Sequence, residues 1–249
     1  MGGVKLKKQH NKKTKAGSGK KGQPSDQSSK WIFWSIGIIA VLVVAYLFLM
    51  PKSTQLALME ATDYEGQPYF GKETAKVKIV EFGDYKCPAC KTFNEELVKQ
   101  IDKDFVETGI AQFYFFQDPF LAVDSHRTAL FAETVYGELG NDLFWKFHDL
   151  LYKNQPEDLS LEKQDYFTED KLKGLIGQIA DQKQTEKVMQ AFTAKKYQAA
   201  VDKDLAIVKR LDVRGTPTLY INGKRFEGTT MDDFKKAVEE AANPVTEGK

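Results

Sequence analysis

Cysteine and histidine are scarce in this chain of 249 residues, which contains only two cysteines and three histidines. A structural zinc site takes four ligands, mostly Cys and His. Cys87 and Cys90 supply half of such a site, but His10 belongs to a separate N-terminal tail. His126 and His148 fall in a predicted helical region, where we expect them at an interface or on the surface. No second pair of cysteines is present to build a framework of several disulfides. The two cysteines therefore need another explanation.

The first thirty residues contain almost no acids, and the next twenty contain no charged residue. Residues 1–30 contain nine lysines, no arginine and a single acid, Asp26, which gives this segment a formal charge of +8. Because the whole chain carries +1, the remaining residues carry about −7. Residues 1–30 also have almost no apolar side chains to bury, so we expect a disordered tail. Residues 31–50 then form a run of twenty uncharged residues, a length that matches one crossing of the hydrocarbon core of a bilayer.

These two segments predict a membrane-anchored protein. Trp31, Trp34 and Tyr46 lie toward the ends of the uncharged run, where aromatic rings favour the membrane interface. The positive-inside rule places the lysine tail in the cytoplasm and residues 52–249 outside it. A cleaved signal peptide is the alternative, but its apolar core is shorter, at about 7–15 residues, and ends at a small-residue cleavage site. Lysines beside a membrane are explained by topology and anionic lipid, so we expect membrane lipid as a partner and no nucleic acid.

The sequence around the two cysteines predicts a redox pair. The motif Cys-Pro-Ala-Cys at 87–90 follows the apolar run 77–82 and precedes the helix-favouring run 91–97. A strand that leads into a helix places Cys87 at the helix N-terminus, where free backbone N–H groups and the helix dipole favour a thiolate. Residues three apart on a helix share a face, so Cys87 and Cys90 can form a disulfide. Closing so small a ring removes little entropy from the unfolded chain, so this disulfide is better explained as chemistry than as a structural crosslink.

The segment after the predicted anchor has the pattern of an α/β protein. Residues 51–66 are predicted to be a linker and residues 67–243 a folded domain. The pattern predicts a βαβ unit, a helical insertion over residues 121–212, a β-hairpin and a last helix. The predicted strands cover 76–82, 110–116, 218–221 and 224–226, and the flanking helices end near 105 and 242. Asn222-Gly223, between the last two strands, is a strong signal for a hairpin turn.

This order of elements resembles the thioredoxin fold of DsbA-type thiol–disulfide oxidoreductases. Residues 81–90, Glu-Phe-Gly-Asp-Tyr-Lys-Cys-Pro-Ala-Cys, and residues 215–218, Gly-Thr-Pro-Thr, look like the membrane-anchored BdbD-like proteins of Gram-positive bacteria. The resemblance covers residues 66–242 and implies a thioredoxin fold whose βαβ and ββα halves are separated by a helical insertion and preceded by one transmembrane helix. Ala89 departs from family members that carry histidine between the cysteines, so one stabiliser of the thiolate is missing.

The resemblance also implies roles for the residues around the sulfurs. Cys87 matches the attacking cysteine and Cys90 its resolving partner, and this chemistry needs no separate redox cofactor. Pro217 matches a cis-proline that faces the disulfide, and Thr216 a residue whose backbone pairs with a substrate chain. Glu81 matches a partly buried acid beneath the disulfide that exchanges protons with Cys90. The alternative for Glu81 is a glutamate at the end of a strand that simply reaches water.

The resemblance further implies a metal site away from the sulfurs. Gln67, Glu133 and Asp204 lie in segments similar to those that supply calcium ligands in the BdbD-like branch. All three side chains offer oxygen donors, as Ca²⁺ requires, so a structural Ca²⁺ is expected there. The alternative is that the two acids lie on exposed helix faces, where acids are most common.

The function implied by the resemblance is the donation of disulfides outside the cytoplasm. The expected clients are secreted or cell-surface proteins with reduced cysteines, and a DsbB-like quinone-reducing membrane protein would reoxidise the enzyme. A disulfide reductase or isomerase is the alternative, because nothing in the sequence fixes the reduction potential. A receptor or adhesion domain with a vestigial disulfide is a third interpretation. Phe144, Trp145 and Phe147 are expected either to line an apolar groove for clients or to be buried in the core.

Overall fold

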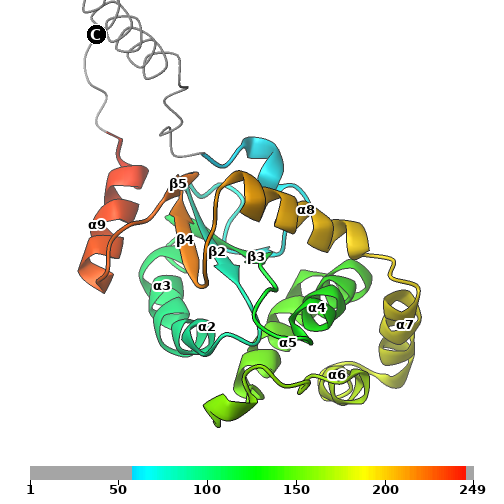
Figure 1. Ribbon diagram of the computed structural model, residues 1–249. Coiled ribbons are helices and arrows are strands. Elements are labelled where there is room, and N and C mark those ends of the chain that lie inside the picture. Colours follow the sequence, from blue (N-terminus) through cyan, green and yellow to red (C-terminus); the bar gives the residue numbers. More distant parts are fainter. Residues whose placement is uncertain (1–57, 245–249) are drawn as a thin grey trace, which may run out of the picture. The chain divides into compact units, whose positions relative to one another are not determined.

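The computed structural model describes residues 58–244. The predicted lysine tail and membrane anchor lie outside these residues, as does the first part of the predicted linker, residues 51–57. Within the described part of the chain, no helix is both long and apolar enough to cross a membrane. A five-stranded sheet occupies the centre of this part, and a group of helices lies to one side of it (Figure 1).

The sheet has the strand order β1-β3-β2-β4-β5. β2 (Val77–Gly83) and β3 (Ala111–Gln117) are parallel neighbours, and β4 (Thr218–Ile221) and β5 (Lys224–Arg225) form the predicted hairpin, with β4 antiparallel to β2. All residues of β3 are buried, because helices cover both faces of the sheet. β1 (Tyr69–Phe70) pairs antiparallel with β3 at the far edge. It has no counterpart in the sequence prediction, because two residues are too short to give a periodic signal.

One long helix leads away from the cysteines. It comprises α2 (Pro88–Thr92), η2 (Phe93–Val98), α3 (Lys99–Ile101) and η3 (Asp102–Val106), of which η2 and η3 have the wider π-helical hydrogen-bond pattern. π-helical turns inside α-helices are rare and are often found at functional sites. Gly109, with a φ of 79°, follows the helix and allows the chain to turn into β3.

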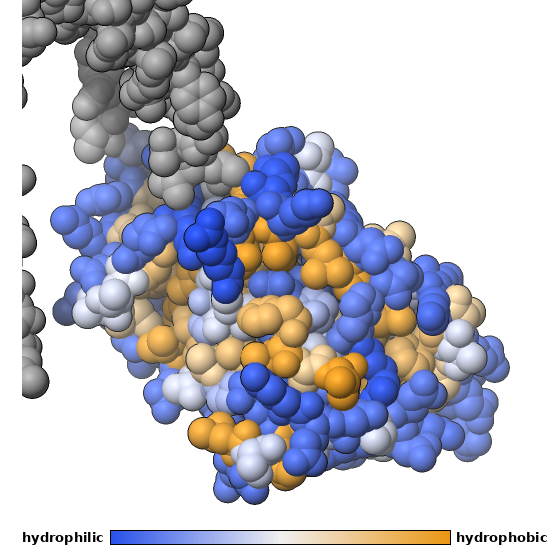
Figure 2. Space-filling view, viewed as in Figure 1, coloured by the Kyte–Doolittle hydropathy of each residue, from blue (hydrophilic) through white to orange (hydrophobic). Residues whose placement is uncertain are grey.

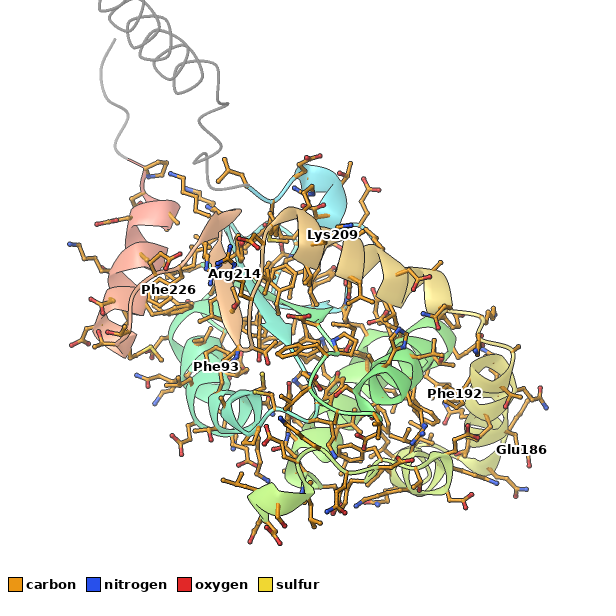
Figure 3. All side chains as sticks on the ribbon, viewed as in Figure 1. Phe93, Glu186, Phe192, Lys209, Arg214 and Phe226 are labelled. Atoms are coloured by element: carbon orange, nitrogen blue, oxygen red, sulfur yellow. The ribbon has the colours of Figure 1, made fainter. Side chains whose placement is uncertain are left out.

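The helical insertion predicted between the two halves is present. It contains α4 (Ser125–Leu139), α5 (Asn141–Lys153), the short turn η4 (Leu159–Leu161), α6 (Glu169–Ile176), α7 (Gln182–Thr193) and α8 (Gln198–Arg210). Phe131 of α4 contacts both Phe147 of α5 and Phe192 of α7, with ring centroids 5.3 and 5.0 Å apart. Figure 3 shows Phe192 on the inner side of α7 and Glu186 on its outer side. This is the arrangement of an amphipathic helix that covers an apolar core.

Three apolar cores hold the domain together. On one face of the sheet, the long helix and α9 (Met231–Ala242) bury side chains such as Ile79. On the other face, α8 and the segment before β1 cover side chains such as Phe82. The third core fills the insertion and includes both Cys87 and Cys90, so the insertion packs directly against the sulfurs. Hydrophilic side chains cover much of the face shown in Figure 2, with hydrophobic patches between them.

Residues 58–66 differ from the linker predicted over 51–66, because they pack against the domain. Residues Ala61–Tyr64 form the 3-10 turn η1, and the Met59 N–H donates a hydrogen bond to the Gly223 carbonyl at 3.0 Å. The carboxylate of Asp63 is buried and forms an ion pair with Arg210 of α8. No local sequence pattern predicts this packing, since Arg210 lies 147 positions after Asp63.

Candidate active site

The active-site turn joins β2 to α2. Cys87 is the N-cap residue of α2, with the extended backbone angles φ −78° and ψ 119°. Pro88 occupies the first helical position, where a missing N–H costs no hydrogen bond. Both cysteines are thiols in this structure. The predicted position of Cys87 at a strand-to-helix junction is confirmed.

Cys87 has the surroundings of a stabilised thiolate. Its side chain remains 8 % exposed. The Cys90 thiol beside it has the largest effect and lowers the pKa of Cys87, while burial opposes this effect. The Thr216 side chain and the backbone N–H groups of Cys90 and Ala89 also lower the pKa of Cys87, to about 6 overall. A large share of Cys87 is therefore ionised at neutral pH.

Cys90 and Glu81 lie beneath Cys87 and are fully buried. Burial raises the pKa of Cys90 well above its usual range, and the neighbouring Cys87 and Glu81 raise it further. Burial also raises the pKa of Glu81 well above its usual range, with a further contribution from Cys87, whereas the Cys90 thiol acts in the opposite direction. Neither carboxyl oxygen of Glu81 has a hydrogen-bond partner in the described part of the protein. Glu81 is therefore the buried acid implied by the resemblance, and not a glutamate that reaches water.

The loop before β4 lies against the attacking sulfur. The Thr216–Pro217 peptide bond is cis, as the resemblance implies. The Cys87 thiol donates a hydrogen bond to the carbonyl oxygen of Thr216 at 3.4 Å. The hydroxyl oxygen of Thr216 is buried and has no partner of ordinary hydrogen-bond geometry among residues 58–244. The structure thus brings four of the predicted site elements together: both cysteines, Glu81 and the Thr216–Pro217 loop.

The active-site turn is also held by charged residues that the sequence analysis does not single out. One carboxylate oxygen of Asp84 accepts the Lys86 N–H at 2.8 Å, and the other accepts the N–H groups of Phe120 and Leu121 at 3.0 and 2.9 Å. The ammonium group of Lys86 is buried and forms an ion pair with Asp124 at 3.2 Å. A lysine is usually a surface residue, and its partner here comes 38 positions later, so local sequence gave no signal for this buried pair.

An apolar groove of about 390 Å³ lies beside Pro217. Its apolar lining residues are Phe93, Leu97, Ile101, Leu219, Phe226, Met231 and Phe234. Phe93 projects from the long helix and Phe226 from the segment after β5 (Figure 3). This groove belongs to the thioredoxin part of the domain. Phe144 and Phe147 do not line it, because both are fully buried in the core of the insertion, against which Trp145 also packs.

The three predicted metal ligands lie close together at the junction of the insertion and the sheet. Gln67 precedes β1, Glu133 lies on α4 and Asp204 on α8. The Gln67 side-chain amide donates to one Asp204 oxygen at 2.6 Å. Gln117, a residue that the sequence analysis does not single out, connects the two acids. Its backbone N–H donates to Asp204 at 2.8 Å and its side-chain amide to Glu133 at 3.0 Å.

Both acids of this cluster are buried, so they are not the exposed surface acids of the alternative. Burial raises the pKa of Glu133 to about 7, and burial together with the charge of Glu133 raises the pKa of Asp204 well above its usual range. Neither carboxylate has a basic side chain as an ion-pair partner among residues 58–244. No group of three or more His, Cys, Asp or Glu side chains in this part of the chain is arranged to hold a metal ion, so amide oxygens would have to complete the site. Two buried, uncompensated acids with adjacent amides suit a hard cation such as Ca²⁺.

His148 is buried, which corrects the prediction of an interfacial or surface histidine. Burial lowers its pKa to about 3, so the ring is neutral at physiological pH. Its two ring nitrogens lie 3.1 Å from the Tyr85 hydroxyl and 3.1 Å from the Asn94 side-chain oxygen. These partners come from the active-site turn and from the long helix, so they are invisible to an argument based on neighbours in sequence. His126 is exposed, as expected.

Comparisons with known proteins agree with this geometry. A family model described as thioredoxin matches residues 63–240. The probable disulfide bond formation protein D of Bacillus cereus is 32 % identical over 209 residues, covering 84 % of this chain and 93 % of the relative. The disulfide bond formation protein D of Bacillus subtilis is 35 % identical over 181 residues, covering 70 % of this chain and 77 % of the relative. The crystal structure of oxidised BdbD from Bacillus subtilis superposes with a TM-score of 0.67 at 32 % identity, covering 75 % of this chain and 96 % of that one.

Proposed function

The chain belongs to the thioredoxin-fold family of DsbA-like thiol–disulfide oxidoreductases, with disulfide bond formation protein D among its relatives, and from this membership we propose that it donates the Cys87–Cys90 disulfide to exported proteins. Thiol–disulfide exchange at this pair is the activity of the family. The direction of exchange, the clients and the roles of the surrounding residues are the proposal.

The observation that carries the proposal is the contrast between the two cysteines. Cys87 lies at a helix N-terminus with its pKa lowered to about 6, while Cys90 is fully buried with a raised pKa. A thiolate stabilised by the folded protein makes the reduced enzyme more stable, and the disulfide then becomes a stronger oxidant. This contrast favours disulfide donation over reduction or isomerisation.

The mechanism follows from the position of each sulfur. A client thiolate attacks Cys87, because its sulfur is partly exposed whereas Cys90 is sealed in the core. The Cys87–Cys90 bond breaks, the client forms a mixed disulfide with Cys87, and Cys90 leaves with the electron pair. A second client thiolate then attacks the client sulfur of the mixed disulfide. The client leaves oxidised, and the enzyme is left with two reduced cysteines.

Glu81 exchanges a proton with Cys90 during this cycle. Its raised pKa lets the carboxyl group hold a proton near neutral pH. The carboxyl gives this proton to the Cys90 sulfur as that sulfur leaves, and takes it back when the enzyme is reoxidised. The absence of other hydrogen-bond partners for Glu81 in the described structure supports this role.

The client chain is held on the side of Pro217. The backbone of Thr216, whose carbonyl lies 3.4 Å from the Cys87 sulfur, pairs with the client next to its cysteine. Apolar client side chains then occupy the neighbouring groove lined by Phe93 and Phe226. The clients are secreted or cell-surface proteins with reduced cysteines, and a DsbB-like quinone-reducing membrane protein reoxidises the enzyme.

The Gln67, Glu133 and Asp204 cluster holds a structural Ca²⁺. The burial of both acids without a basic partner in the described residues supports this assignment. A bound cation would neutralise the two carboxylates, which lie on α4 and α8, and would stabilise the folded domain because it binds only the folded state. It takes no part in the exchange of electrons.

The catalytic domain acts outside the cytoplasm, attached by residues 31–50 to the membrane, with the lysine tail of residues 1–30 on the cytoplasmic side. The uncharged run in the sequence supports the anchor, and the relatedness to disulfide bond formation protein D supports the extracytoplasmic location. Membrane lipid is the partner of these N-terminal segments.

Two measurements test the proposed function. Cys87→Ser should abolish oxidation of a reduced client, whereas Cys90→Ser should accumulate the client as a mixed disulfide on Cys87, visible on non-reducing gels. A redox titration against glutathione then gives the direction. A potential near about −120 mV, as in strong disulfide donors, supports the proposal, and one near about −270 mV identifies a reductase instead.

A further inference from the structure

Gln155 connects the helical insertion to the backbone of the active-site turn. It follows α5 directly, and its side chain is 5 % exposed. Its side-chain amide nitrogen donates to the carbonyl oxygen of Tyr85 at 2.8 Å and to that of Cys87 at 3.1 Å. One NH₂ group has two hydrogens, so it can satisfy both acceptors at once. These two carbonyls lie on either side of Lys86, just before the catalytic helix.

The peptide between Cys87 and Pro88 has few ways to be held in place. Proline has no N–H, so the plane of this peptide is fixed only through the Cys87 carbonyl. That carbonyl accepts the Lys91 N–H at 3.1 Å as the first bond of the helix, and Gln155 provides its second donor. The Tyr85 carbonyl has Gln155 as its side-chain donor.

The orientation of these carbonyls affects the charge on the neighbouring sulfur. The Cys90 thiol has the largest stabilising effect on the Cys87 thiolate, and the N–H groups of Cys90 and Ala89, which come from the same turn of backbone, add to it. The Thr216 carbonyl oxygen already lies 3.4 Å from the sulfur, and a further carbonyl oxygen turned toward it would repel the negative charge of the thiolate. Hydrogen bonds to Gln155 direct both carbonyls toward the insertion instead.

We propose that Gln155 is a positioning residue that fixes the Cys87–Pro88 peptide and thereby holds Cys87 in its reactive state. The inference rests on the proposed exchange at Cys87 and assigns to the insertion a direct part in setting the reactivity of the sulfur. Gln155 touches neither the client nor the reacting sulfurs, and it acts through the backbone of the turn.

The test compares Gln155→Leu with a control elsewhere in the insertion. Leucine is similar in size but donates no hydrogen bond. Thr185→Val is the matched control, because the Thr185 hydroxyl donates to the Asp181 carbonyl at 2.9 Å in α7, and its removal also deletes one hydrogen bond from the insertion. The thiolate absorbance of each reduced protein is titrated with pH, and each melting temperature is measured.

We expect Gln155→Leu to raise the pKa of Cys87 by about one unit. The ratio of thiolate to thiol then becomes about tenfold smaller at any given pH. The equilibrium constant with glutathione should change by the same factor, about 30 mV toward a weaker oxidant. Thr185→Val should lower the melting temperature and leave both quantities unchanged. If Gln155→Leu also lowers only the melting temperature, Gln155 is structural and the inference is wrong.

Gln155→Glu keeps the test decisive if the leucine variant does not fold. The glutamate has the same shape, but when ionised it offers only acceptors to the two carbonyl oxygens, so the pKa of Cys87 should rise at least as far as in Gln155→Leu. An unchanged Cys87 pKa in a folded Gln155→Glu protein contradicts the inference. The titration uses no client protein, so its outcome is separate from that of the Cys87→Ser and Cys90→Ser experiments.

Discussion

Glu81 and the Glu133–Asp204 pair are all buried acids, but their polar surroundings differ. Both oxygens of Glu81 lack a hydrogen-bond partner in the described structure, and a thiol is the polar group that acts on it most directly. Glu133 and Asp204 instead accept hydrogen bonds from the amides of Gln67 and Gln117. An acid with no donors is stable only when it carries its own proton, whereas two acids held close together are balanced by a cation. The donors around a buried acid, and not burial alone, therefore separate a proton-exchanging site from a cation site.

Removing either Glu133 or Asp204 tests the proposed cation site and should have the largest effect on stability in the presence of calcium. Calcium at about one hundred times its dissociation constant should stabilise the wild-type protein by about 2.7 kcal/mol. For a domain of this size, that raises the melting temperature by about 5–10 °C. Glu133→Ala and Asp204→Ala should each abolish this shift, and Glu81→Gln should retain it. A shift that survives in both alanine variants, or is missing from the wild type, would show that no cation binds there.

The redox state of the cysteines tests the active site, where the protein stabilises the negative charge of the Cys87 thiolate. The pKa of Cys87 is lowered from about 8.5 in an unfolded chain to about 6 in the folded protein. The thiolate therefore stabilises the reduced fold, fully at pH values above about 8.5, and this stability is lost as the pH falls through 6. Allowing for solvent screening at the partly exposed sulfur, we expect the reduced protein to be more stable than the oxidised one by about 2 kcal/mol at pH 8.5. Thermal melts of both forms should show the difference growing from pH 5.5 to about 8.5 and no further, because the buried Cys90 thiol, whose pKa is raised, keeps its proton in the folded state while it ionises in the unfolded chain above that pH. Equal melting temperatures throughout would indicate a weak oxidant.

Calcium binding to the Glu133–Asp204 pair should depend on pH, because protons and calcium compete for the same two carboxylates. The pKa of Glu133 is raised to about 7, so at pH 6 the calcium-free cluster is mostly protonated. A cation must displace that proton, and burial raises the pKa of Asp204 as well, so affinity should be at least about tenfold lower at pH 6 than at pH 8. Calorimetric titrations at the two values check this expectation, with Glu81→Gln as a control that should show the same dependence. Affinity that does not change with pH would remove Glu133 from the site.

Glu81→Gln should have the smallest effect on calcium binding and acts on a rate instead. Glutamine keeps the shape of the side chain but cannot exchange the proton, so reoxidation of Cys90 by glutathione disulfide should slow by at most about 100-fold, the low end of what a positioned proton carrier contributes. The pH dependence of that rate should also flatten, since the group that titrates near Cys90 is gone. Stopped-flow measurements of the wild type and variant across neutral pH check both points. An identical rate and profile would exclude Glu81 from proton exchange, while leaving its burial unexplained.

Much of the fold could be predicted from the sequence because its signals are local. The strand before Cys87, the helix after it and the hairpin at Asn222-Gly223 each depend on residues that are neighbours along the chain. The helical insertion was recognisable from the spacing of its apolar residues. The two-residue strand β1 and the packing of residues 58–66 were not, since each depends on partners far away in sequence.

The candidate site divides in the same way. Cys87 and Cys90 could be identified from their spacing and from the elements on either side. Gln117, which links the acids of the cation cluster, ends a strand whose sequence reads as ordinary buried β-structure. His148 reads as a helical surface residue until α5 is packed against the sheet and the long helix.

The position of the reactive sulfurs follows from local sequence, because a strand, a proline and a helix N-terminus within ten residues suffice to place a cysteine and favour its thiolate. The polar side chains that surround those sulfurs depend on how distant elements pack. Glu81 has no hydrogen-bond partner among the described residues. Gln155 contacts the active-site turn although it lies about seventy positions later in the sequence. The physical reason is that burial and desolvation are properties of packed elements, whereas helix and strand formation are properties of neighbouring residues.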